Sequence, residues 1–219
     1  MSESDSFIDE VAEEVRRDRL FALMRKYGWI GVAAVLLIVG GASWNEWHKA
    51  RVEAASEAFG DAVMAAMTNP DPAERLSALA SLSTDGMAGR AAVLGFLTAS
   101  EAEAAGKHDD AVKAVQTVAD DATMADSYRQ LAQLKLVMMN GDKMDPAARD
   151  STLTALAAPG APYRPLALEQ QALILLASGK NDEAADLLAK IAEDADATPA
   201  LQGRVHDILI ALGKPLPGN

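Results

Sequence analysis

The chain has 219 residues, a formal net charge of −12 and apolar residues at half of its positions. That length suits one ordinary domain with an appendage, and the acidic balance excludes a nucleic-acid binder, which needs clustered lysine and arginine to neutralise phosphates. The lack of cysteine excludes disulfides, thiolate nucleophiles and cysteine-ligated metal centres. Abundant alanine with few aromatic or β-branched runs predicts an all-α protein.

The first segment, residues 1–26, has apolar residues at near-helical spacing between Ser6 and Lys26. This pattern predicts a short amphipathic helix on the cytoplasmic side of a membrane. Such a helix can lie on the membrane surface, dock on a partner, or only fix the orientation of the segment that follows. The last interpretation is preferred.

Residues 27–47 are predicted to cross a membrane as one helix. The nineteen residues from Tyr27 to Asn45 carry no formal charge, which is about the length that spans a hydrocarbon core of ~30 Å. Tyr27 and Trp29 lie at one end of this stretch, and Trp44 and Trp47 lie at the other. Aromatic rings at both ends are typical of a membrane span, because these side chains prefer the headgroup level.

Basic residues are more numerous before the span than after it, and the positive-inside rule therefore predicts a cytoplasmic N-terminus. The five that precede it are Arg16, Arg17, Arg19, Arg25 and Lys26. Residues 48–219 would then form a periplasmic domain of a bacterial inner-membrane protein. Two alternatives stay open: a signal peptide cleaved near Gly40, against which the long acidic segment 1–26 argues, and a buried core helix.

The domain after the span shows a repeat with a period near 34 residues. Glycines that end helical runs recur with spacings of 35, 38 and 34 residues, and a glycine in this position is predicted to close a helix in the left-handed conformation. Two of the turns match, and each leads to an alanine at which a second helix can approach closely. In the third turn Asp145 is the predicted N-cap and Pro146 the first helical residue. These repeat residues are Gly106, Ala111, Gly141, Gly179, Ala184 and Gly213.

The period and the helix–turn–helix pattern resemble tetratricopeptide repeats. They predict an α-solenoid of four hairpins at about 49–82, 87–120, 124–157 and 163–194, closed by a helix at 199–212. The first of these hairpins has no glycine signature, and it can instead be a continuation of the membrane helix.

The whole chain resembles the ancillary SecYEG translocon subunit family. The resemblance rests on the run Phe7-Ile8-Asp9-Glu10-Val11, the run Glu14-Val15-Arg16-Arg17-Asp18-Arg19-Leu20, the basic flank Arg25-Lys26-Tyr27-Gly28, the single span and the degenerate repeats. It implies an inner-membrane protein beside the Sec translocon that helps to receive or hand over exported chains. The implied partners are translocon subunits, a peptidyl-prolyl-isomerase-like chaperone and exported chains.

No catalytic, cofactor or metal site is predicted, because the sequence contains no nucleophile elbow, no phosphate loop and no histidines at ligand spacing. We therefore expect a non-enzymatic protein that binds other proteins. Tyrosine and arginine are enriched in binding hot spots, which makes Tyr128, Arg129, Tyr163 and Arg164 the candidate partner contacts. Met138 and Met139 are expected in the hairpin core, although methionine also suits adaptable binding surfaces.

Two other functions remain open from the sequence. The repeats could serve as a scaffold or assembly factor for another envelope complex, such as a division or respiratory machine. Alternatively, the chain could be a membrane-tethered regulator that acts through its cytoplasmic helix, residues 6–26.

Overall fold

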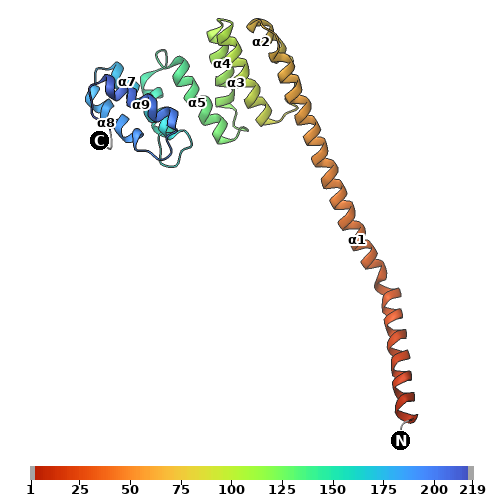
Figure 1. The fold of residues 1–219 in the computed structure, drawn as a ribbon. Helices are drawn as coiled ribbons and strands as arrows, with labels where there is room; N and C mark the ends of the chain where they lie inside the picture. The colour runs from red at the N-terminus through yellow and green to blue at the C-terminus, as the bar shows by residue number, and fades with distance from the viewer. Residues whose placement is uncertain (1–2, 217–219) are drawn as a thin grey trace. The chain divides into compact units, whose positions relative to one another are not determined.

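The computed structural model describes residues 3–216, and the side chains of these residues except 3–23, 28 and 32. In this part of the chain the secondary structure consists of helices joined by turns and short loops, with no strand. The chain divides at Gly60 into two units, which are described separately. In order, the helices are α1 (Glu3–Met67), α2 (Pro72–Ala80), α3 (Ala88–Ala104), α4 (His108–Asp120), α5 (Asp126–Asn140), α6 (Pro146–Leu156), α7 (Arg164–Ala177), α8 (Asn181–Ala192) and α9 (Pro199–Ala211) (Figure 1).

Most of the first unit, residues 1–60, is a long stretch of α1. Among the described residues, one helix is long and apolar enough to cross a membrane, and it lies within Met24–Met67 of α1 with none of its apolar window buried. Leu37 and Ile38 at its centre are 77% and 71% exposed. Four aromatic side chains flank the centre and are exposed as well: Tyr27, Trp29, Trp44 and Trp47. The side chains of Arg16, Arg17 and Arg19 lie outside the described residues.

The second unit, from Asp61 onward, contains three helical hairpins, α3–α4, α5–α6 and α7–α8, followed by the single helix α9 (Figure 1). Their bounds agree within a few residues with the predicted hairpins at 87–120, 124–157 and 163–194 and with the predicted last helix. Before them α1 continues without a break to Met67, and α2 follows after a short turn. The first half of the predicted hairpin at 49–82 is thus a continuation of α1, which is the alternative left open for this segment.

Local sequence signals explain where many helices begin. The carboxylate of Asp145 accepts a hydrogen bond from the backbone N–H of Ala148, and Pro146 is the first residue of α6, as predicted. Asp71 before α2 and Thr198 before α9 cap their helices in the same way, each followed by a proline. A proline fits the first helical turn because its missing N–H would have had no intrahelical partner there.

Glycines close α3, α7 and α9 in the left-handed conformation, with φ of +72° at Gly106, +74° at Gly179 and +68° at Gly213. Gly141 at the end of α5 contradicts the expectation, because its φ is −57° and the backbone stays right-handed. The chain there continues into another tight turn, in which the N–H groups of Lys143 and Met144 both donate to the carbonyl oxygen of Asn140. The longer α5–α6 turn thus satisfies this carbonyl without a left-handed residue.

The core of the second unit consists of three apolar clusters. The first joins α3, α4 and α5, the second joins α7, α8 and α9, and the third joins α5, α6 and α7. Ala111 and Ala184 at the starts of α4 and α8 are completely buried. Helices α5 and α7 each belong to two clusters, so each hairpin packs on its neighbours in sequence, as in a repeat protein.

Candidate functional site

Two of the predicted partner contacts lie at the start of α5. The ring of Tyr128 is half-buried and packs against the first core cluster. Arg129 forms an ion pair of 3.0 Å with Asp126 one helical turn earlier. Both side chains therefore have intramolecular contacts, and their role in partner binding stays a prediction.

The other two predicted contacts lie at the start of α7. Tyr163 is the residue before the helix, and its half-buried ring packs against the third core cluster. Arg164 forms an ion pair with Asp194, which follows α8. This pair ties the beginning of the third hairpin to its end. Neither residue lines either of the two pockets described below.

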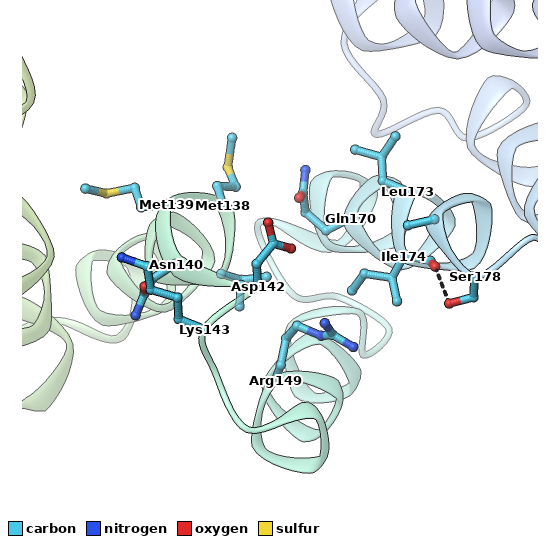
Figure 2. A pocket seen from close by; sticks show the side chains of 13 residues that line it. Met138, Met139, Asn140, Asp142, Lys143, Arg149, Gln170, Leu173, Ile174 and Ser178 are labelled. Atoms are coloured by element: carbon cyan, nitrogen blue, oxygen red, sulfur yellow. Dashed lines mark hydrogen bonds between the residues drawn. The ribbon is translucent and has the colours of Figure 1, made fainter. Parts of the chain in front are cut away.

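A pocket of about 380 Å³ opens between the C-terminal halves of α5 and α7. Met138 and Leu173 project from its two sides, and Gln170 and Ile174 lie along the α7 side (Figure 2). Met138 is 61% exposed and Leu173 is 39% exposed. Two large apolar side chains thus stand uncovered on facing helices of the repeat stack.

The exposure of Met138 contradicts its expected place in the hairpin core, whereas Met139 is half-buried against the first cluster. Leu134 lies one turn earlier on the same face of α5, and it is buried in a cluster with Ala167 of α7. The pocket, by contrast, is lined by later α7 residues such as Leu173. The two helices therefore pack closely near Leu134 and Ala167, and no neighbouring helix covers Met138 one turn further on.

The rim of the pocket is polar and comes mainly from the α5–α6 turn and α6. Arg149 forms an ion pair with Asp150 at 3.0 Å. Asp142 and Lys143 form no ion pair with another described residue. A second hollow of about 430 Å³ lies between this turn and α4, and it shares Asn140 and Lys143 with the first. The pocket therefore has apolar walls and a rim that carries charges of both signs.

Ion pairs hold the helices behind the α7 wall. Both carboxylate oxygens of Glu169, a residue only 6% exposed, accept hydrogen bonds of 2.9 Å from the guanidinium of Arg204 in α9. This pair raises the pKa of Arg204. Lys214 donates to Asp182 at 2.6 Å, which lowers the pKa of Asp182 and raises that of Lys214. The last three helices are thus joined by charged contacts as well as by their apolar cluster.

The pocket is suited to binding, since its lining supplies apolar surface and hydrogen-bonding groups. The described residues include no group of three or more histidine, cysteine or acidic side chains that could hold a metal ion. His108 lies outside the pocket and is paired with Glu103, with 2.6 Å between Nδ1 and Oε1. The apolar lining with its hydrogen-bonding groups agrees with a surface for a protein segment.

Sequence reasoning did not identify Gln170, Leu173 and Ile174 as pocket residues. The available signal was the α5–α6 turn, which is longer than the other two hairpin turns and leads to a short α6. This turn contributes Gly141, Asp142 and Lys143 to the lining of the pocket. The hydrophobic pattern of α7 does not distinguish Leu173 from the other apolar residues of the helix, so it could not predict that this side chain lines a pocket.

The sequence matches the family described as tetratricopeptide repeat-like domain over residues 25–214. The chain belongs to this family. No curated protein and no solved structure gave a match. The match to the tetratricopeptide repeat-like family starts at Arg25, so it includes the apolar part of α1 as well as the hairpins. Repeat domains of this kind generally serve as non-enzymatic scaffolds for protein–protein interaction.

Proposed function

We propose that this chain is a non-enzymatic protein anchored in the bacterial inner membrane by residues 27–47. Its domain, residues 48–219, binds protein partners at the periplasmic side of the Sec translocon and assists the hand-over of exported chains. The observation that carries the proposal is the exposed apolar stretch of α1 in a chain of the tetratricopeptide repeat-like family. An exposed apolar helix of this length is unfavourable in water, and it has the length needed to cross the hydrocarbon core of a membrane.

The flanks of the apolar stretch support its orientation in a membrane. Five basic residues precede the span, whereas Lys49 and Arg51 are the basic residues that follow it closely. Cytoplasmic flanks carry the excess of lysine and arginine, so residues 1–26 stay in the cytoplasm and the repeats are exported. The choice of the Sec translocon as the location rests on the resemblance of the chain to the ancillary subunit family, in the runs within residues 7–28, the single span and the degenerate repeats.

The pocket between α5 and α7 is the binding surface that we assign to this function. Its apolar part includes the thioether of Met138, which adapts to different side chains, and such surfaces suit partners of varied sequence. Its polar rim supplies donors and acceptors for a polypeptide backbone. Exported chains are varied and extended before they fold, which matches both properties of the pocket.

Single-cysteine labelling tests the topology, since the natural chain has no cysteine. The variants Ser4→Cys and Ser151→Cys place one thiol on each side of the span, and the side chain of Ser151 is exposed. A membrane-impermeant maleimide should label Ser151→Cys in cells with a permeabilised outer membrane and should label Ser4→Cys only after lysis. Labelling of Ser4→Cys alone before lysis would overturn the proposed orientation.

In-cell crosslinking tests the partner. A photoreactive residue replaces Met138 or Leu173 in the pocket, and Glu183, an exposed residue of α8, serves as the control position. Capture of translocon subunits, an isomerase-like chaperone or exported chains from the pocket positions alone would support the proposal. Capture of only division or respiratory proteins would reassign the chain as a scaffold. If function in the cell were lost on removal of residues 6–26 and kept on removal of the repeats, the chain would instead act as a membrane-tethered regulator.

A further inference from the structure

Three side chains, named the ladder below, lie in a row at the C-terminal end of the apolar stretch of α1: Trp44, Trp47 and Arg51. The rings of Trp44 and Trp47 lie 5.3 Å apart between centroids, and the guanidinium carbon of Arg51 lies 4.5 Å from the centroid of the Trp47 ring. Positions i, i+3 and i+7 share one face of a helix. Because Trp44 is 67% exposed and Trp47 is 49% exposed, this face of α1 is accessible to solvent or lipid.

The ladder face carries a cation without a carboxylate to neutralise it. Arg51 stacks on Trp47 and forms no hydrogen bond or ion pair with another described residue. The nearby charged residues Glu46, Lys49 and Glu53 lie about 140° to 160° around the helix from Arg51, at about 100° per residue. The N–H donors of the guanidinium are therefore available to an external anion.

The depth of the ladder suits the headgroup layer of a bilayer. Trp47 lies two residues beyond Asn45, the last residue of the uncharged stretch, which is a distance of about 3 Å along a helix. Helical side chains point back toward the N-terminus, so the side chain of Arg51 reaches toward the bilayer and lies over Trp47. The polar layer on each side of the hydrocarbon is about 5–8 Å thick.

We propose that Trp44, Trp47 and Arg51 form a binding site for the phosphate group of an anionic phospholipid. One surface of the planar guanidinium stacks on the indole, while its N–H groups donate to two phosphate oxygens. The indoles lie against the upper acyl chains of the same lipid. The site fixes how deeply α1 sits in the membrane. This inference rests on the membrane anchoring in the proposed function.

Quenching of tryptophan fluorescence by brominated lipids tests the site. The full chain with Trp29→Phe retains only the two tryptophans of the ladder and is placed in mixed micelles with dibrominated phosphatidylglycerol or dibrominated phosphatidylcholine. We expect stronger quenching by the phosphatidylglycerol at equal mole fraction. Arg51→Gln should reduce this preference about fivefold, the effect of one basic residue near a lipid surface. Lys49→Gln removes a charge from the opposite face, outside the site, and should reduce the preference less than Arg51→Gln does.

The outcomes separate the lipid site from the membrane anchor. The lipid site would be overturned if Arg51→Gln and Lys49→Gln had equal effects, or if the Trp29→Phe chain showed no preference for phosphatidylglycerol. Strong quenching by both lipids would still support the membrane anchor in that case. Absence of quenching by either lipid would overturn the anchor and the site together. A preference abolished by inorganic phosphate, but not by chloride at the same ionic strength, would identify a free-anion site and overturn the lipid assignment.

Discussion

Substitution of Gly95 by alanine should destabilise the repeat domain, although alanine is the better helix former. Gly95 lies in the middle of α3, where the helix passes close to α4. A Cβ atom on this residue would lie 2.5 Å from the Cγ2 methyl carbon of Val118 and 3.6 Å from the carbonyl oxygen of Ala114. Glycine at this position therefore permits the close packing of the α3–α4 hairpin.

The magnitude follows from two opposing effects. Carbon atoms in contact are normally about 3.5–4.0 Å apart, so the new methyl group must move Val118 by about 1 Å or more. Val118 is only 2% exposed and its β-branched side chain has few alternative rotamers, so the backbone must also shift. Overpacking of this kind costs about 1–3 kcal/mol, while the helix propensity of alanine restores about 1 kcal/mol. We expect a net loss of up to about 2 kcal/mol.

Equilibrium unfolding of the full chain by urea in detergent, followed by circular dichroism, measures the loss. Gly203→Ala is the matched control, since Gly203 lies within α9 and a Cβ there would meet no atom within 4 Å. That variant should be more stable than the natural chain by about 0.5–1 kcal/mol. Gly95→Ala with the same or a higher midpoint than Gly203→Ala would refute the packing argument.

Three further predictions concern other side chains. Arg204→Met should lower the free energy of unfolding by about 2 kcal/mol in urea titrations, because the buried carboxylate of Glu169 loses both of its hydrogen bonds. The Asp182–Lys214 pair should stabilise the fold fully above pH 3.8, and this stabilisation should be lost as the pH falls through the lowered pKa of Asp182. On the alkaline side the stabilisation should be full below pH 10.5 and should be lost as the pH rises through the raised pKa of Lys214. The variant Asp182→Asn should flatten both limbs of a stability–pH curve, and unchanged limbs would contradict the assignment. Met138→Gln should weaken capture of partners while it changes the unfolding free energy by less than about 0.5 kcal/mol, because the side chain is mostly exposed.

Much of the fold could be predicted because the signals for it are local. Asp145 and Pro146 start α6 through a hydrogen bond and a backbone constraint that involve only their near neighbours. Gly106 and Gly179 end α3 and α7 for a similar reason, since only glycine enters the left-handed region without a side-chain clash. Gly141 shows the limit of this reasoning, because the next few residues supply another way to close α5.

The binding surface depended on contacts between distant parts of the chain. Met138 and Leu134 share a face of α5, and the sequence gives both the same apolar character; only the neighbouring helix makes one exposed and the other buried. Likewise Glu169 and Arg204 are 35 residues apart in the sequence, and they form their ion pair only when α7 and α9 pack together.

The sequence by itself determined the helices, their repeat period and the uncharged stretch of α1, because each arises from interactions within a few turns of helix. The tertiary structure decided which apolar side chains stay uncovered between α5 and α7. Exposure depends on the spacing of whole helices, and that spacing is the sum of many packing contacts that no single stretch of sequence contains.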